Sequence, residues 1–212
     1  MRYFFVTILI LSSLSLGAQT KQVKTRLRTV DNGVYTEKFR VLASDTSCRH
    51  GDYQMIYKNR VVEKGTYKKG VRSGEWSFWG LENQLEFVYD YDNQALSKVL
   101  PHDGHVYTSR TLPCLFLGSP LIPHLFICRR VFYPVKEHGT SVDCQVVLSL
   151  KVNSRGRMTG YELVRESKPA FNKAVLDAAA QIPKSWRWVP ARDGGRFIDS
   201  DYRITIIFDA SN

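Results

Sequence analysis

The residues that could perform chemistry are few, and their spacing matches no common catalytic or metal site. The nearest approach to a cluster of metal ligands is Cys48-Arg49-His50 or His102-Asp103-Gly104-His105, but neither has the close second pair of ligands typical of zinc sites. Glu162 and Glu166 fall in or just after an expected strand, where charged side chains face solvent. No Gly-rich phosphate loop or Gly-x-Ser-x-Gly motif occurs. We therefore expect no catalytic residue, no metal ligand and no cofactor, and a protein that is not an enzyme.

The N-terminus has the layout of a secretory signal peptide. Arg2 precedes an apolar run over residues 3–16, and the small residues Gly17 and Ala18 follow it. Because this run is shorter than the roughly 20 residues that a spanning helix needs, we expect residues 1–18 to be removed after export. The predicted location is the periplasm or cell envelope, with a secreted form as an alternative. An uncleaved N-terminal anchor is the other alternative, and only then do we expect membrane association.

Composition favours packed domains and argues against a nucleic-acid partner. The 212 residues are 43% hydrophobic and 12% aromatic, which suffices for packed cores. The formal net charge of +10 is scattered along the chain. The longest tight basic groups, Lys68-Lys69 and Arg129-Arg130, are too short to form a nucleic-acid arm. A basic exported protein of this kind is suited to anionic envelope surfaces, with ordinary solvated faces as the alternative.

Four cysteines, Cys48, Cys114, Cys128 and Cys144, could form disulfides in an exported chain. The sequence permits three pairings and selects none of them. A bond between Cys114 and Cys128 would close the shortest loop, whereas one between Cys128 and Cys144 would tie the middle of the chain to its final domain. Free buried thiols are the alternative, because cysteine is a common core residue.

Residues 19–96 are expected to form a β-rich module with an internal repeat. Aromatic residues and turn residues return at short intervals, which is typical of successive hairpins. Gly51 and Gly74 are 23 residues apart, as are Tyr53 and Trp76. Each hairpin has too little apolar surface to be stable alone, so stacking against its neighbours must complete the core.

The region of about 50–95 resembles the MORN-type repeats of YwqK-like proteins. The likeness rests on Gly51-Asp52-Tyr53, on Gly65-Thr66-Tyr67-Lys68-Lys69-Gly70 and on Gly74-Glu75-Trp76-Ser77-Phe78-Trp79. The second copy lacks the closing glycine and has Asp92-Asn93 instead. The resemblance implies a small array that acts as a rigid presenting module.

Residues 97–132 lose both patterns and form a Pro-rich stretch. Prolines 101, 113, 120 and 123 separate short apolar pieces such as Leu115-Phe116-Leu117 and Leu125-Phe126-Ile127. Because the apolar content argues against a flexible linker, we expect an ordered connector packed against one or both modules.

Residues 133–212 are predicted to be an α+β domain with a three-stranded antiparallel sheet and a helix on one of its faces. The first strand has an apolar face of Val146, Leu148, Leu150 and Val152. The second runs over residues 157–165, with Met158, Tyr161 and Leu163 facing inward and a bulge at Gly160. A helix begins at Pro169 and places Phe171, Val175, Ala178 or Ala179, and Ile182 on one side. The last strand covers residues 202–208.

This final region resembles the C-terminal domain of TonB over residues 133–209. The likeness is carried by Tyr133-Pro134, residues 146–152, Gly156, Ser167-Lys168-Pro169-Ala170, Leu176-Asp177 with Ala179, Trp188-Val189-Pro190-Ala191 and Ile206-Ile207-Phe208. Within this set, we expect Gly156, Leu176, Asp177, Trp188, Pro190 and Ala191 to determine the fold rather than to contact a partner.

The TonB resemblance implies that the domain binds a peptide of an outer-membrane receptor by strand addition beside the last strand. The predicted contact residues are Tyr202, Arg203, Ile204, Thr205, Ile206, Ile207 and Phe208. The partner is thus a protein or peptide in TonB-linked transmembrane transport, and a second copy of the domain is an alternative cover for this edge. The chain lacks a clear spanning anchor and a long charged Pro-rich spacer, so an adaptor is expected rather than an energy transducer.

A second function remains open from the sequence. In this alternative, the aromatic MORN-like repeats bind a protein partner and the C-terminal domain is a scaffold. An uncleaved signal segment and an open edge on the last strand would favour the strand-addition function. A buried edge together with an exposed aromatic patch on the repeats would favour the alternative.

Overall fold

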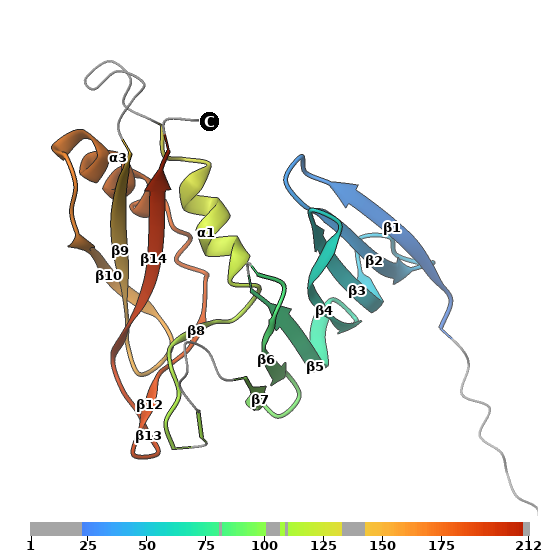
Figure 1. The fold of residues 1–212 in the computed structure, drawn as a ribbon. Helices are drawn as coiled ribbons and strands as arrows, with labels where there is room; N and C mark the ends of the chain where they lie inside the picture. The colour runs from blue at the N-terminus through green and yellow to red at the C-terminus, as the bar shows by residue number, and fades with distance from the viewer. Residues whose placement is uncertain (1–22, 81, 101–106, 109, 133–142, 210–212) are drawn as a thin grey trace, which may run out of the picture.

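The computed structural model describes residues 23–80, 82–100, 107–108, 110–132 and 143–209, which form two lobes joined by a connector (Figure 1). The predicted signal peptide, the two histidines His102 and His105, and Tyr133-Pro134 lie outside these residues. Within the described ranges, no helix combines the length and the apolar character that crossing a membrane requires.

The N-terminal lobe is a seven-stranded antiparallel sheet whose strands lie in chain order. The strands are β1 (Thr25–Asp31), β2 (Thr36–Leu42), β3 (Arg49–Tyr57), β4 (Arg60–Lys68), β5 (Val71–Trp79), β6 (Leu85–Asp90) and β7 (Ala95–Val99). Two-residue turns, Lys58-Asn59 and Lys69-Gly70, join β3 to β4 and β4 to β5 with positive φ at both positions. Such turns match the twist of the strands that they connect, so a meander of hairpins results, as the aromatic and turn pattern predicted.

The two predicted repeats occupy equivalent places in this sheet. Gly51 and Gly74 both have positive φ, at +100° and +62°. Tyr53 and Trp76, on β3 and β5, are buried on the same face, and their ring centroids are 5.2 Å apart. The 23-residue offset is therefore a structural repeat of hairpins, whereas the likeness to MORN repeats remains a prediction.

Each repeat also contributes an arginine that lies over aromatic rings on the buried face. The Arg49 guanidinium lies 4.3 Å from the Phe39 ring centroid, and Arg72, 23 residues later, lies 4.1 Å from that of Trp76. Arg49 donates to Glu37 at 3.2 Å and to the Tyr67 hydroxyl at 3.2 Å. We call two sets of residues the arginine rungs. The first is Arg49 with Glu37 and Tyr67, and the second is Arg72 with Glu63 and Tyr91.

In the second rung, Arg72 pairs with Glu63 and donates to the Tyr91 hydroxyl at 2.6 Å. The Glu63 side chain is only 3% exposed. Its other carboxylate oxygen accepts a hydrogen bond of 3.1 Å from the backbone N–H of Ser119 in the connector. A buried carboxylate of the N-terminal sheet therefore anchors the connector, and sequence patterns had given no sign of this pair.

The C-terminal lobe is a three-stranded antiparallel sheet with helices on one face. The strands are β9 (Cys144–Val152), β10 (Met158–Arg165) and β14 (Ser200–Phe208), in the order β10-β9-β14. Helix α3 (Pro169–Ala179) contacts β9 and β10, and helix α1 (Leu121–Cys128) contacts β14. Two short pairs complete the lobe, β8 (Leu115–Phe116) with β11 (Trp188–Val189) and β12 (Arg192–Asp193) with β13 (Arg196–Phe197). The predicted three strands and helix are confirmed.

The core of this lobe lies between the sheet and the helices. Its buried residues include Val146, Leu148, Leu150 and Val152 of β9 and Phe171, Val175, Ala178 and Ala179 of α3, as the two periodicities predicted. Tyr161 is an exception, since its side chain is 37% exposed. The register shifts between Met158 and Gly160, where the bulge was expected. Such a shift bends the outer strand. Met158 and Leu163 pack against the core, as predicted, and Tyr161 does not.

Gly156 and the Trp188-Val189-Pro190 segment are in direct contact, which explains why both belong to the predicted motif. Gly156 has a φ of +69°, and its carbonyl accepts a hydrogen bond of 3.1 Å from the N–H of Trp188. A Cβ atom at position 156 would overlap the carbonyl oxygen of Trp188. Trp188 and Ala191 are buried, whereas Asp177 is exposed and pairs with Lys173 at 2.6 Å.

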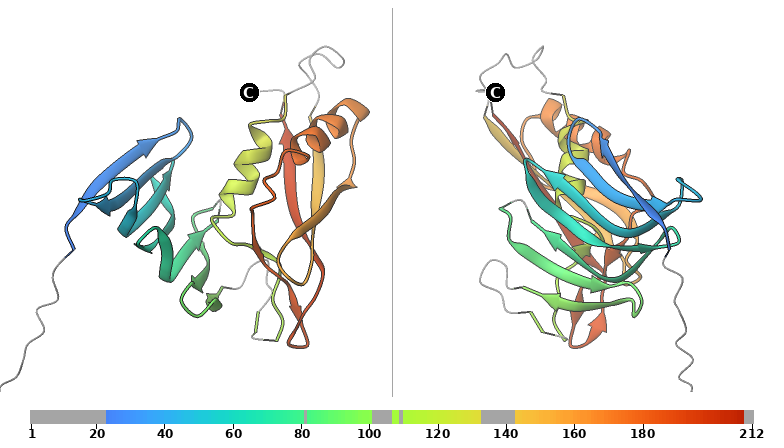
Figure 2. Two further views of the ribbon diagram at one scale, coloured as in Figure 1. Left: turned by 180° about the vertical axis from the view of Figure 1, so that it is seen from behind. Right: turned by 90° about the vertical axis from the view of Figure 1, so that its right-hand side faces the viewer.

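The connector joins the two cores. Helix α1 lies between the seven-stranded sheet and the C-terminal sheet (Figure 1 and Figure 2). Leu121, at its start, belongs to the core of the N-terminal sheet, and Ile127, near its end, belongs to the C-terminal core. The Ser119 hydroxyl donates to the carbonyl of Trp79 at 3.4 Å. The connector, for which no helix was predicted, thus contains a helix that packs against both lobes.

All four cysteines are free thiols in the structure. Cys114 is buried, and burial raises the pKa of its thiol to about 12. The Cys128 thiol lies 3.5 Å from Nε2 of His124, one turn earlier on α1. No disulfide therefore joins Cys48, Cys114, Cys128 and Cys144, and the free-thiol alternative describes the structure.

Candidate functional site

Strand β14 is an edge strand. It pairs with β9 through the register Tyr202 to Leu150 and Ile204 to Leu148, and no other strand of the described residues pairs with it. In an antiparallel ladder, alternate residues direct both N–H and C=O away from the paired neighbour. Residues 201–207 therefore offer a row of outward backbone donors and acceptors about 20 Å long at roughly 3.4 Å per residue.

The side chains of β14 divide between two environments. Ile204, Ile206 and Phe208 are buried in the C-terminal core, where the Phe208 ring lies 4.7 Å from that of Phe171. Arg203 and Thr205 are exposed on the opposite face, and Ile207 is 72% exposed. The predicted alternation along residues 202–208 is confirmed, and the exposed Ile207 lies near the C-terminal end of the strand.

A groove of about 640 Å³ runs along the edge of β14. It is lined by Tyr202 and Ile204 from one face of the strand and by Arg203, Thr205 and Ile207 from the other. Residues of both faces can line one groove only where it follows the strand edge. Ile206 and Phe208, two of the predicted contact residues, do not line it and instead support the strand from the core.

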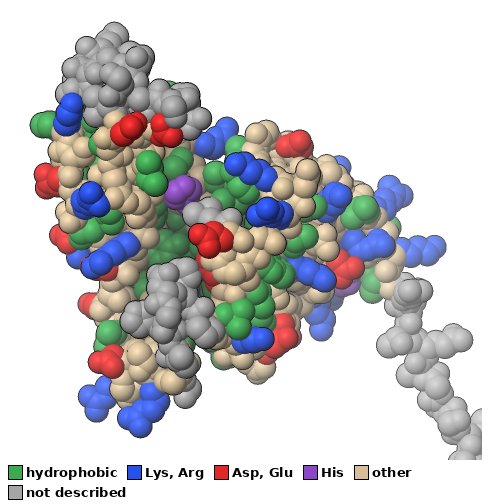
Figure 3. Space-filling model, in the orientation of Figure 1, with side chains coloured by type: hydrophobic (Ala, Val, Ile, Leu, Met, Phe, Trp, Pro, Cys, Tyr) green, Lys and Arg blue, Asp and Glu red, His purple; other side chains and the backbone are tan. Residues whose placement is uncertain are grey.

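The opposite wall of this groove belongs to the N-terminal sheet. Its lining residues are Glu82 and Gln84 in the turn before β6, Glu86 on β6, Val99 at the end of β7 and Leu100 just after it. Pro113 to Leu115, Pro120 and His124 line the groove from the connector. Figure 3 shows a hollow between the two lobes, with hydrophobic side chains in its depth and acidic side chains beside it. Sequence reasoning had missed this wall, because its residues come from a separate module.

Burial and nearby charges determine the protonation states of the side chains that line the groove. Burial, together with the nearby Glu86 carboxylate, raises the pKa of the Tyr202 phenol, so its hydroxyl stays protonated. Burial lowers the pKa of His124, which keeps this imidazole neutral near pH 7. Asp201 accepts a hydrogen bond of 2.9 Å from Lys151 on β9, which lowers the pKa of its carboxyl group. The groove therefore presents neutral hydroxyl and imidazole groups beside carboxylates.

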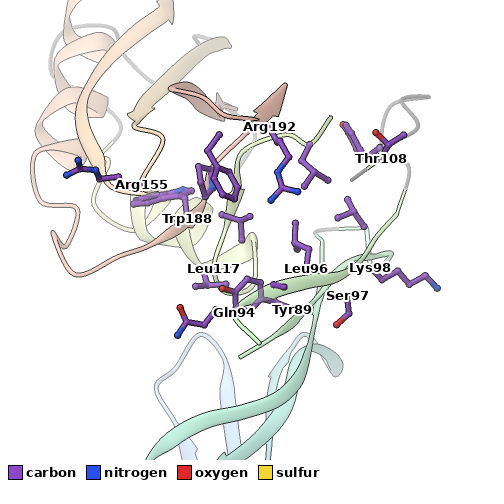
Figure 4. Close-up of a pocket in the computed structure, with 17 residues that line it drawn as sticks. Tyr89, Gln94, Leu96, Ser97, Lys98, Thr108, Leu117, Arg155, Trp188 and Arg192 are labelled. Atoms are coloured by element: carbon purple, nitrogen blue, oxygen red, sulfur yellow. The ribbon is translucent and has the colours of Figure 1, made fainter. Parts of the chain in front are cut away.

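A second cavity, of about 500 Å³, lies between β7 and the segment around Trp188 (Figure 4). Leu96 and Lys98 line it from β7, and Trp188 and Arg192 line it from the C-terminal lobe. The Trp188 indole N–H is buried without a hydrogen-bond partner among the described residues. Trp188, expected only as a fold determinant, thus also forms part of a cavity wall, although this cavity does not reach the β14 edge.

A two-layer α+β domain with an open terminal strand is the class of domain that this lobe defines. Residues 129–210 match the family model described as Gram-negative bacterial TonB protein C-terminal. The matched segment covers less than half of the chain and contains β9, β10, α3 and β14. The predicted TonB C-terminal domain, a domain of the Gram-negative envelope, is therefore present. No curated protein and no solved structure matches the chain.

Proposed function

We propose that this protein is a non-enzymatic adaptor of the cell envelope that binds an extended peptide by strand addition to β14. The peptide comes from an outer-membrane receptor or from another partner in TonB-linked transport. The observation that carries the proposal is the edge of β14. This edge is unpaired among the described residues, and a groove lies beside it. Export of the chain after cleavage of residues 1–18 belongs to the same proposal.

Strand addition accounts for both the unpaired backbone edge of β14 and the side chains that line the groove beside it. The outward N–H and C=O groups of residues 201–207 would bond the peptide backbone, which gives affinity without selecting a sequence. Arg203, Thr205 and Ile207 on the exposed face would contact alternate side chains of the peptide. Selectivity would then come from these side chains and from the remaining walls of the groove.

The burial of the aromatic side chains supports this proposal over the alternative in which the repeats bind the partner. Trp76 and Phe78 are 0% exposed, and Tyr53 is 3% exposed. These rings form the core of the N-terminal sheet with the arginine rungs, so they are engaged within the molecule. An exposed aromatic patch was the feature that would have favoured binding by the repeats.

The test is an NMR titration of the isotope-labelled protein with peptides from the N-termini of outer-membrane receptors. We expect shift changes along residues 201–207 and on β9 beside them. The matched control is the same peptide with alternate backbone nitrogens methylated, which keeps its side chains but removes the N–H donors of a strand. Shifts confined to the seven-stranded sheet, or equal binding of the methylated peptide, would contradict strand addition.

A further inference from the structure

The first strand of the seven-stranded sheet is also an edge strand. Strand β1 is the terminal strand of the sheet and pairs only with β2 among the described residues. Figure 1 and Figure 2 place it at the end of the N-terminal lobe that is farthest from the C-terminal lobe. Its outer edge therefore offers a second row of unpaired backbone N–H and C=O groups, separate from the edge of β14.

The buried face of the sheet continues onto β1, but there it is open to solvent. Directly paired residues of an antiparallel ladder direct their side chains to the same face. Arg26 lies opposite Val41 of β2, which is 1% exposed and belongs to the core of the lobe. Arg26, Arg28 and Val30 therefore share the core side of the sheet. All three are exposed, and Val30 is 45% exposed, so this end of the core side is uncovered in the described structure.

Arg26 belongs to the 23-residue repeat. Arg26, Arg49 and Arg72 follow one another at intervals of 23 residues and lie at the starts of β1, β3 and β5. Arg49, like Arg26, lies opposite Val41, and the guanidinium of Arg72 lies over the buried ring of Trp76. The three arginines are thus on the same side of the sheet and in equivalent places along their strands.

The two arginine rungs follow one rule for the source of their carboxylate. In the first rung, β2 supplies the glutamate and β3 the arginine, and in the second rung β4 supplies the glutamate and β5 the arginine. Each glutamate stands four residues before the residue that lies directly opposite the arginine. A strand that is antiparallel to the arginine strand and lies on its N-terminal side in the sheet therefore completes each rung.

The equivalent arrangement at β1 lacks its carboxylate. No strand of the described residues lies on the outer side of β1. The exposed Arg26 side chain takes part in no ion pair or hydrogen bond with another described residue. Residues 1–24 contain no Asp or Glu, so the segment before β1 has no acidic side chain to offer. The carboxylate that would complete this rung has to come from another molecule.

We propose that the edge of β1 binds an extended acidic segment of a second protein, which adds to the sheet as an antiparallel strand. A Glu or Asp of this segment pairs with Arg26 as Glu37 pairs with Arg49. This inference goes beyond the proposed function, because it uses a different edge and a different partner. The protein then has a strand-addition edge on each lobe, and the buried aromatic rings contact neither partner.

The charge of β1 favours an acidic partner over a second copy of the chain. Lys24, Arg26 and Arg28 place three cations within five residues. Asp31 is the one acidic residue of β1, and its Oδ1 atom accepts a hydrogen bond of 2.8 Å from the N–H of Gly33 at the end of the strand. Pairing of β1 with β1 of a second copy would set cations against cations, which destabilises cross-strand pairs. An acidic strand would meet opposite charge instead.

The experiment uses seven-residue peptides of alternating threonine and valine, whose central residue is glutamate, glutamine or arginine. Binding to the isotope-labelled protein is followed by NMR at residues 25–31. The glutamate peptide should bind about fivefold more tightly than the glutamine peptide, as expected for one partly exposed charge pair. The arginine peptide should bind most weakly. We expect these differences to shrink at high salt, because β1 is exposed.

Two substitutions of Arg26 test the pairing, and both leave an exposed position without a buried partner. Arg26→Gln should abolish the preference for glutamate, and Arg26→Glu should reverse it, so that the arginine peptide binds most tightly. Lys38→Gln is the matched control. Lys38 is an exposed cation on β2 opposite Thr29, and it therefore lies on the other face of the sheet. This control should keep the full preference.

The possible outcomes separate this inference from its alternatives. Equal affinity of the three peptides, or a preference for glutamate that survives Arg26→Glu, would overturn the acidic partner. Shifts at residues 25–31 that depend on protein concentration without peptide would identify a second copy as the occupant and overturn the inference. No shift there with any peptide would show that the charges keep this edge unpaired. Residues 201–207 report independently on β14, so each of these results leaves the proposed function standing.

Discussion

The two lobes bury their cores in different ways. The C-terminal lobe packs helices on one face of its sheet, and its core is built of apolar side chains such as Leu148, Phe171 and Ile204. The N-terminal lobe is one curved sheet, and its buried face combines aromatic rings with the paired side chains of Arg72 and Glu63. Helix α1 covers part of this sheet through Leu121, Ile122 and Leu125, and long side chains that stack on one another complete the cover.

Because the two cores differ, we expect different substitutions to destabilise each lobe. Removing volume is the main threat to the C-terminal core, because its stability comes from close apolar packing. Removing one partner of a charge pair is the main threat to the N-terminal sheet, because the other partner is left buried. The repeat allows the two charge pairs to be compared within one protein, since the Glu63 side chain is 3% exposed and the Glu37 side chain is 21% exposed.

The largest effect is expected from Phe171→Ala. Phe171 is 0% exposed and contacts Phe208 of β14, so the substitution leaves a cavity between helix and sheet. The expected loss is about 3–5 kcal/mol in the free energy of unfolding, measured by urea denaturation. Val164→Ala, at a position that is 43% exposed on β10, is the control and should cost less than about 1 kcal/mol. Equal losses would show that the core does not lie where it is described.

The next effect separates the two arginine rungs. Arg72→Ala should cost about 3 kcal/mol, because it leaves the buried Glu63 carboxylate without its cation. Arg49→Ala removes the equivalent arginine from Glu37, whose side chain is 21% exposed, and should cost about 1 kcal/mol. Both losses are measured by denaturation. A larger loss for Arg49→Ala would contradict the order of burial in the two rungs.

A smaller effect is expected from Gly65→Ala on β4. A Cβ atom at position 65 would overlap the ring of Trp76, which is 0% exposed and cannot move freely. Overpacking of this kind costs about 1–3 kcal/mol. Gly160→Ala on β10 is the matched control, since a Cβ atom at position 160 would have nothing within 4 Å of it. A lower melting temperature for Gly65→Ala alone would confirm that the Trp76 ring packs on the strand backbone.

The periodic elements could be predicted from the sequence. The alternation of Val146 to Val152 and of residues 202–208 indicated both the strands and their buried faces, because one face of each strand packs in the core. The apolar side of the helix after Pro169 was equally clear. The 23-residue repeat also corresponds to equivalent strands, since the same turn and the same stacking are used twice.

Helix α1 and the groove wall opposite β14 could not be predicted in the same way. The prolines at 120 and 123 hid the helix within the expected ordered connector. Pro120 is the N-cap and Pro123 lies in the first turn, where a missing N–H breaks no helical hydrogen bond. Glu82, Gln84 and Glu86 show no pattern of their own. They line the same groove as β14 because α1 joins the two lobes. Local periodicity does not encode this tertiary arrangement.

The central claim is that β14 has an open edge that a peptide can complete. Amide hydrogen exchange of residues 201–207, measured with and without a bound receptor peptide, tests it most directly. We predict that alternate amides are protected by β9 in the free protein, and that the intervening amides exchange fast until the peptide protects them. Protection of the whole strand in the free protein, or no added protection with the peptide bound, would contradict the account.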